Sequence, residues 1–222
     1  MASTIKPITF WGGPLGPNPG KVYMILKELR IPHERIEIPL SDVKKPEYTK
    51  HNPNGRLPTI YDPNTALTIW ESGAIIEYLV DKYDKDHKLS FPAGTNEYYL
   101  TKQWLYFQMS GQGPYYGQAW WFKLLHEPKI PSAIDRYINE IRRVSGVLNG
   151  VLEGREYLVG DKCTFADLAF VTWQMSILKI VEYDQAKDFP NVQAWIDRMS
   201  QRPAIKAFLV ERDERMAASG KK

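Results

Sequence analysis

Residues 52–72 read NPNGRLPTIYDPNTALTIWES, and this stretch decides the fold of the first part of the chain. It holds two apolar segments, Leu57–Tyr61 and Ala66–Trp70, joined by DPNT. Asp at the first position and Pro at the second favour a type I turn, so the two segments predict an antiparallel hairpin. Glu71 and Ser72 then begin a helix. A strand next to a helix N-terminus can bind a small extended peptide through backbone groups.

The residues before this hairpin predict a βαβ unit. Residues 5–10 read as one strand, and residues 35–40 alternate apolar and polar side chains as a second. Between them, apolar residues follow the spacing of one helix face: Val22, Ile25, Leu26 and Leu29. The two strands should therefore be parallel, with a right-handed crossover. A further helix over residues 75–83 follows the hairpin, so the order βαβ then ββα predicts a thioredoxin-like domain.

Strand patterns end after this domain. Residues 85–95 combine a charged run with Pro and Gly, which predicts a linker. Helical patterns recur beyond it, over residues 98–109, 133–152, 164–180 and 192–199. Thr164 and Asp167 have the spacing of a capping box, and the helix behind them is apolar nearly all round, which predicts burial at the centre of a bundle. The predicted fold class is an α/β thioredoxin-like domain (1–84), a linker (85–95) and an all-α domain (96–222).

Composition narrows the classes of function. The chain has 222 residues, of which 43% are hydrophobic. Its single cysteine cannot form an internal disulfide, and this favours a reducing compartment. No signal-peptide pattern and no apolar run near the about 20 residues that span a bilayer are visible, so we expect a cytoplasmic protein without a membrane partner. Net charge is +3 without a basic stripe, so nucleic acid is not an expected partner. The four histidines lack metal-ligand spacing, and no metal is expected.

Asn18 followed by Pro19 is typical of a helix N-cap with proline at the first helical position. An Asn-Pro pair alone indicates no more than a well-capped helix. In a thioredoxin-like plan, however, this helix start is where a reactive sulfur lies, because free N–H groups and the positive dipole end stabilise an anion. The Asn18 side chain could cap with its oxygen and direct its amide N–H groups at a thiolate.

Six segments now form a set: GPNPGKV, NPNGRLPTI, IWESGAIIEYL, WLYFQMSGQGPYYGQ, YLVGDKCTFADLAFVTW and FPNVQAWIDRMSQRPA. In this order and spacing, the chain resembles the cytosolic glutathione transferases from about residue 9 to residue 208. It looks closest to the fungal branch that includes the globular domain of the yeast nitrogen-regulating prion protein, with the bacterial nu-class as more distant kin. The resemblance implies a homodimer that uses glutathione as co-substrate, without a metal.

The resemblance also implies roles for matching residues. Asn18 would face the glutathione sulfur, in place of the Tyr or Ser of other classes. Leu57, before a cis Pro58, would pair through its backbone with the cysteinyl part of glutathione. Glu71 would hold the γ-glutamyl amine and Ser72 its carboxylate, which suits the charges of both groups. The simpler alternative is that Ser72 is an ordinary N-cap and Glu71 a first-turn acid.

One position departs from the family pattern. A histidine that contacts glutathione in the yeast relative corresponds to Val43 here. Lys44 next to it could meet the glycyl carboxylate instead, or could be a solvated surface lysine. Arg56 is expected near the pocket, but it could equally be a charge on the surface or between the two domains.

The electrophile pocket is expected between the two domains. Apolar walls with few polar groups are typical of such sites. The candidates are Trp11, Met109, Gln112, Tyr115, Tyr116 and Trp120. Each of these side chains could instead be a core or dimer contact. Cys163 lies far from the predicted sulfur site, so a protein nucleophile is not expected.

These features predict a detoxifying glutathione transferase that stabilises the glutathione thiolate and conjugates it to a hydrophobic electrophile. Loss of one donor to such a charge can cost about 3 kcal/mol, and less is expected for Asn18→Ala if backbone donors remain. Two alternatives stay open. One is a glutathione-dependent peroxidase or disulfide reductase, and the other is a glutathione-binding regulatory or ligand-carrying protein with little turnover.

Overall fold

The computed structural model describes residues 5–13 and 16–218, which form two compact units. The N-terminal unit comprises the described residues up to Lys88 together with residues 202–218, and the helical unit comprises residues 89–201. The last helix, α10 (Pro203–Ala218), packs against α1 (Pro17–Glu28) and so belongs to the N-terminal unit. Its placement differs from the predicted division, which grouped residues 96–222 together.

The N-terminal unit contains a four-stranded sheet in the order β2-β1-β3-β4. The parallel pair is β1 (Ile8–Trp11) with β2 (His33–Ile36), and β3 (Thr59–Asp62) runs antiparallel to both β1 and β4 (Leu67–Trp70). This topology confirms the thioredoxin-like prediction. The second strand, however, ends at Ile36 rather than at residue 40, because Pro39 cannot donate to a sheet.

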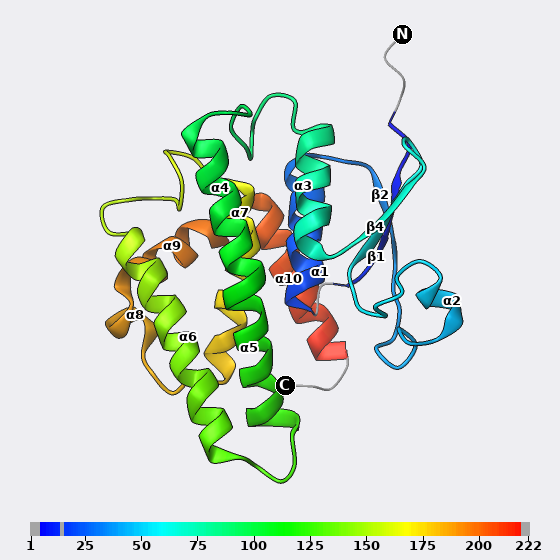
Figure 1. The fold of residues 1–222 in the computed structure, drawn as a ribbon. Coiled ribbons are helices and arrows are strands. Elements are labelled where there is room, and N and C mark those ends of the chain that lie inside the picture. Colours follow the sequence, from blue (N-terminus) through cyan, green and yellow to red (C-terminus); the bar gives the residue numbers. More distant parts are fainter. Residues whose placement is uncertain (1–4, 14–15, 219–222) are drawn as a thin grey trace. The chain divides into compact units, whose positions relative to one another are not determined.

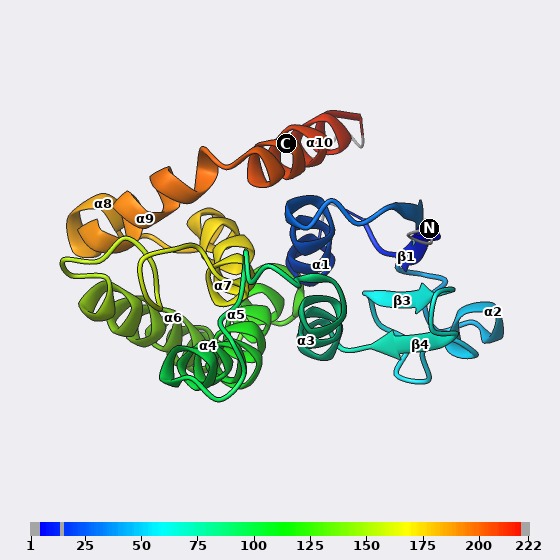
Figure 2. The same ribbon diagram turned by 90° about the horizontal axis from the view of Figure 1, so that it is seen from above.

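The helices of this unit cover the sheet unequally. Figure 2 shows α1 and α3 (Ser72–Tyr83) on one side of the sheet and the short α2 (Pro46–Thr49) on the other. The predicted apolar faces are buried against the sheet, with no exposed surface left on Val22, Ile25, Leu26, Ile75, Ile76, Leu79, Phe10 and Ile60. This core holds the starts of α1 and α3 next to one another.

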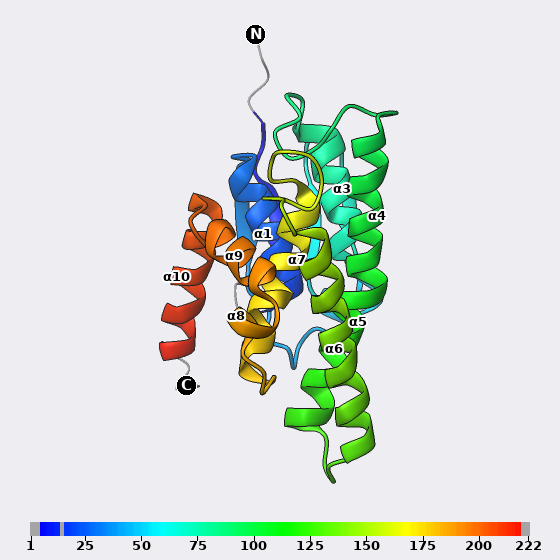
Figure 3. The same cartoon turned by 90° about the vertical axis from the view of Figure 1, so that its left-hand side faces the viewer.

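The helical unit begins with a nearly continuous pair of helices, α4 (Asn96–Phe107) and α5 (Gly113–Trp120), which lies beside α6 (Pro131–Val151) in Figures 1 and 3. Two π-helical turns, η1 (Gln108–Gln112) and η2 (Trp121–Leu125), follow α4 and α5. The unit is completed by α7 (Phe165–Ser176), η3 (Ile177–Lys179), α8 (Gln185–Asp188) and α9 (Pro190–Ser200). Within the described residues, none of the helices has both the length and the apolar character needed to cross a membrane.

The predicted capping box at the start of α7 is confirmed. The fully buried Asp167 carboxylate accepts hydrogen bonds from the Thr164 backbone N–H (2.9 Å), the Leu158 N–H (3.0 Å) and the Trp195 Nε1–H (3.1 Å). Burial raises the pKa of Asp167, while these donors oppose the shift. The helix behind it is buried at nearly every position, as predicted for the centre of a bundle.

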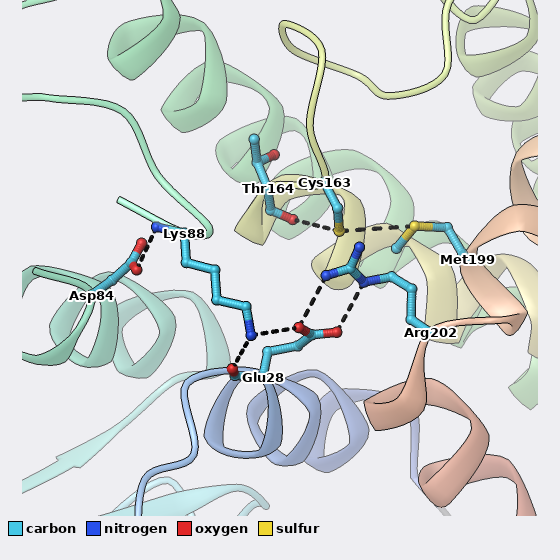
Figure 4. A network of polar contacts seen from close by, with 7 residues as sticks. All are labelled: Glu28, Asp84, Lys88, Cys163, Thr164, Met199 and Arg202. Carbon is cyan, nitrogen blue, oxygen red and sulfur yellow. Dashed lines mark hydrogen bonds and ion pairs between the residues drawn. The ribbon is translucent and has the colours of Figure 1, made fainter. Parts of the chain in front are cut away.

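A second buried carboxylate organises the N-terminal unit. Glu28, at the end of α1, accepts two bonds from the Arg202 guanidinium, at 2.9 and 3.0 Å, and lies 3.2 Å from Lys88 Nζ (Figure 4). Lys88 and Arg202 are the residues of this unit that flank the helical unit in sequence. One carboxylate therefore fixes both places where the chain leaves and re-enters the N-terminal unit.

We expect Glu28→Gln to lower the free energy of unfolding by about 1–3 kcal/mol, because Arg202 and Lys88 lose a shared anion in a mostly buried site. The loss is moderated because both cations are partly exposed and hence screened by solvent. Urea unfolding followed by circular dichroism measures this difference. Glu34→Gln, at an exposed position of β2, is the matched control. Equal stabilities of the two variants would contradict the role assigned to Glu28.

Candidate functional site

Strand register gathers three distant chain segments at one end of the sheet. Thr59 of β3 pairs with Trp11 of β1 on one side and with Trp70 of β4 on the other. The chain after β1, the chain before β3 and the chain after β4 therefore meet at the same end. These segments carry the predicted glutathione-binding residues.

The first segment leads into α1, which begins earlier than predicted. The N-cap residue of α1 is Gly16, which has no side chain that could cap the helix with a hydrogen bond. Pro17 is the first helical residue. The prediction that Asn18 is the N-cap is therefore wrong, because Pro17 already has the fixed backbone angle that suits a first helical position. Asn18 is the second residue of the helix and is partly buried.

Hydrogen-bond donors at this helix start are concentrated in Asn18. Pro17 and Pro19 carry no backbone N–H. The N–H of Gly20 donates to the Gly16 carbonyl at 3.0 Å. Among the first four residues of α1, Asn18 thus combines a backbone N–H with a side-chain amide. The helix dipole still favours an anion here, but the donors that would contact it come mainly from one residue.

The second segment is the loop before β3. The Leu57–Pro58 peptide bond is cis, which confirms the prediction. Asn52 holds the loop: its Oδ1 accepts from the Asn54 backbone N–H at 2.9 Å, and its Nδ2 donates to the Arg56 carbonyl at 2.7 Å. The Tyr48 hydroxyl donates to the same carbonyl at 2.7 Å. These bonds fix the backbone that leads to Leu57.

The third segment leads from β4 into α3. Glu71 has φ 71° and ψ 117°, a left-handed backbone conformation that costs a non-glycine residue about 1–3 kcal/mol. Its side chain is exposed and does not cap α3. Ser72 is the first helical residue, so the alternative that it is an ordinary N-cap is wrong. A strained exposed acid and a buried serine at a helix start are typical of a ligand site rather than of a cap.

Sequence reasoning missed Lys21. Its side chain is fully buried, and its Nζ lies 3.3 Å from Ser72 Oγ. Burial lowers the pKa of Lys21 to about 7, and the nearby Glu71 carboxylate partly opposes this shift. One signal was available: Lys21 is three residues after Asn18, so both occupy the same face of α1.

Lys44 lies at the same end of the sheet. Its Nζ donates to the Asn54 carbonyl at 2.6 Å, and Asn54 Nδ2 donates to Glu71 Oε1 at 3.4 Å. Asn54 thus connects Lys44 to Glu71, a link that the sequence did not predict. The side chain of Val43, in contrast, packs in a small buried cluster with Trp11 and Tyr48.

Three of the predicted electrophile-pocket residues are buried. Trp11 lies in the cluster with Val43 and stacks on His51, with ring centroids 4.5 Å apart. Gln112 and Tyr116 have no exposed surface and both hydrogen-bond to Gln174, at 3.3 and 3.0 Å. For Gln112 and Tyr116, the prediction of a pocket lining is corrected to a core role in the polar network of the helical unit.

The other three candidates for the electrophile pocket are partly exposed: Met109, Tyr115 and Trp120. Tyr115 packs against Tyr137, with ring centroids 6.3 Å apart.

Cys163 is buried beside Met199, with their sulfurs 3.9 Å apart (Figure 4). In the part of the chain that the structure describes, no three His, Cys, Asp or Glu residues come together as metal ligands.

Comparison with known proteins places this arrangement in a family. Residues 16–82 match the model of the glutathione S-transferase N-terminal domain, and residues 117–203 match that of the C-terminal domain. The chain is 55% identical over 218 residues to the glutathione S-transferase-like protein tpcF of Aspergillus fumigatus, covering 93% of this chain and 96% of the relative.

Solved structures of similar proteins carry ligands. The glutathione transferase URE2P8 of Phanerochaete chrysosporium, crystallised with oxidized glutathione, is 42% identical with a TM-score of 0.91, covering 97% of this chain and 99% of that one. Ure2p5 of the same organism, cocrystallised with 1-(S-glutathionyl)-2,4-dinitrobenzene, is 41% identical with a TM-score of 0.87, covering 97% and 98%. The sequence motifs, the fold and these relatives agree: this chain belongs to the glutathione S-transferase family.

Proposed function

We propose that this protein binds reduced glutathione at the end of the sheet described above and conjugates it, through its sulfur, to a hydrophobic electrophile. The observation that carries the proposal is the register of β3, which gathers Asn18, the Leu57–Pro58 loop and the start of α3 at one place. Each of these segments suits a different part of the tripeptide.

The middle of the peptide would lie along Leu57. This residue comes just before the paired part of β3, so an extended ligand can continue the sheet there through backbone hydrogen bonds. The γ-glutamyl end would lie at α3. Glu71 suits the ammonium group, and Ser72 at the positive end of the helix dipole suits the carboxylate. At the other end of the tripeptide, Lys44, whose Nζ donates to the Asn54 carbonyl, would meet the glycyl carboxylate.

The sulfur would lie at the start of α1. A free thiol with a pKa near about 8.5 is mostly protonated at neutral pH, although the thiolate is the nucleophile. Hydrogen bonds from Asn18 to the thiolate favour the charged form and so lower this pKa. The protein contributes position and anion stabilisation, while glutathione supplies the nucleophile.

The acceptor class is supported by a relative. Ure2p5 was cocrystallised with a dinitrobenzene conjugate of glutathione, which is the product expected when a thiolate displaces halide from a halodinitrobenzene. In that reaction a carbon–sulfur bond forms, the carbon–halogen bond breaks, and the halide leaves with the electron pair. We propose the same substitution for this protein, with flat apolar electrophiles as acceptors.

We expect Asn18→Ala to lower kcat/KM for 1-chloro-2,4-dinitrobenzene by about 30- to 100-fold, or about 2–3 kcal/mol. The effect should be close to that of a full oxyanion donor, because the two prolines leave few backbone donors to replace the side chain. Steady-state kinetics under saturating glutathione measure it. Asn96→Ala, in the exposed first turn of α4, is the control. An Asn18→Ala enzyme as active as this control would remove Asn18 from the mechanism.

A second function has specific support, since URE2P8 was crystallised with oxidized glutathione. The same thiolate could reduce a hydroperoxide or a mixed disulfide and end as glutathione disulfide. Purified protein should be assayed in parallel with 1-chloro-2,4-dinitrobenzene, cumene hydroperoxide and a glutathionylated thiol. We expect the highest kcat/KM with the nitroaromatic. A higher value with the disulfide would replace conjugation by reduction, and binding without turnover on all three would indicate a regulatory or carrier protein.

A further inference from the structure

The turn before β3 is held by hydrogen bonds to both backbone groups of Asn54. Its N–H donates to Asn52 Oδ1 at 2.9 Å, and its carbonyl accepts from Lys44 Nζ at 2.6 Å. The next residue, Gly55, is buried and has φ 58°, a left-handed conformation that glycine adopts without strain. A Cβ atom added at Gly55 would lie 2.6 Å from the Val43 carbonyl oxygen, so the turn packs closely against the segment before α2. These contacts fix the position of Asn54 through its backbone.

The side chain of Asn54 reaches a different segment of the chain. It is exposed, and its Nδ2 donates to Glu71 Oε1 at 3.4 Å. This distance is longer than that of a typical N–H···O bond, so we assign the contact a modest strength. A carboxylate has two oxygens with about four acceptor positions, so Glu71 can accept from a second group at the same time. Asn54 thus contacts the side chain that suits the γ-glutamyl ammonium group.

Two constraints set the direction of the Glu71 side chain. The left-handed backbone of Glu71, with φ 71° and ψ 117°, sets the direction of its Cα–Cβ bond. The hydrogen bond from Asn54 sets the position of the carboxylate at the other end of the side chain. An exposed glutamate side chain loses rotamer entropy when it becomes ordered. A carboxylate that is held in place before the ligand binds avoids part of this cost, and this increases the affinity.

From these contacts, we infer that Asn54 is a positioning residue for glutathione: it holds the Glu71 carboxylate where the γ-glutamyl ammonium group binds. This inference rests on the proposed function and adds to it a residue that strengthens the selectivity for a free amino group at this end of the ligand. Asn54 acts through Glu71. The Asn54 carbonyl, which accepts from Lys44, is a backbone group and is kept in every variant of this residue. A substitution of Asn54 should therefore affect the γ-glutamyl end of the ligand and leave the glycyl end unchanged.

The test compares three ligands whose sulfur is blocked by a methyl group. These are S-methylglutathione, its analogue with glutarate in place of the γ-glutamyl residue, which lacks the amino group, and S-methyl-γ-glutamylcysteine, which lacks the glycine. Calorimetry, with displacement titrations for the weaker ligands, gives their Kd values for the wild-type protein, Asn54→Ala, Glu71→Ala and the double variant. Asn96→Ala, in the exposed first turn of α4, is the control. Circular dichroism establishes whether each variant is folded.

We expect Asn54→Ala to weaken the binding of S-methylglutathione and of S-methyl-γ-glutamylcysteine by about 3- to 10-fold, the range for one ordinary hydrogen bond. The Kd of the glutarate analogue should change by less than about 2-fold, the usual error of additivity, because this ligand has no ammonium group for Glu71 to bind. In the Glu71→Ala background, Asn54→Ala should have no further effect, because Asn54 acts through Glu71. Asn54→Ser, whose side chain is shorter, is a second variant with the same expected result.

The three ligands separate a positioning role from a structural one. Equal losses for all three, no loss for any of them, or a loss that persists in the Glu71→Ala background would overturn the inference and leave Asn54 a residue of the turn alone. If Asn54→Ala does not fold, the same comparison with Asn54→Ser decides. A wild-type protein that binds S-methylglutathione and the glutarate analogue equally well would also overturn the inference, because Glu71 would then bind no ammonium group. A wild-type protein without affinity for S-methylglutathione would overturn the proposed function itself.

Discussion

The site depends on the pairing of Thr59. This residue is fully buried, forms the centre of three paired strands, and its hydroxyl lies 2.7 Å from the Tyr48 hydroxyl and accepts a bond from Asn52 Nδ2 at 3.1 Å. Tyr48 and Asn52, whose side chains hold the loop before Leu57, are therefore hydrogen-bonded to β3, the strand that follows this loop. A slip of one residue would turn Thr59 to the other face of the sheet and separate the loop from the starts of α1 and α3.

Two departures from the usual rules of protein stability lie at this site. Glu71 has a left-handed backbone without being a glycine, and Lys21 is a buried cation whose Nζ lies 3.3 Å from Ser72 Oγ. Two buried carboxylates elsewhere are satisfied, since Asp167 accepts backbone and indole donors and Glu28 accepts a guanidinium. Strain and desolvation that persist at one end of a sheet are typical of a site built for a ligand.

The sequence predicted the features that local patterns determine. Apolar periodicity and turn residues set the βαβ–ββα order, the family resemblance marked Pro58 as the cis proline, and the spacing of Thr164 and Asp167 predicted the capping box. The failures have tertiary causes. Gln112 and Tyr116 looked like pocket residues because aromatic and amide side chains occur in pockets, but their neighbours Gln174 and Ser145 come from other helices and bury them. Lys21 escaped notice because its partner Ser72 is 51 residues away.

The central claim is that Asn18, at a helix start with few other donors, stabilises the thiolate of bound glutathione. The most direct measurement is the ultraviolet absorbance of that thiolate, titrated against pH in the complex of the wild-type protein with glutathione. We expect a thiol pKa clearly below the value of about 8.5 for a free thiol. A bound thiol that titrates at the same pH as free glutathione would contradict it.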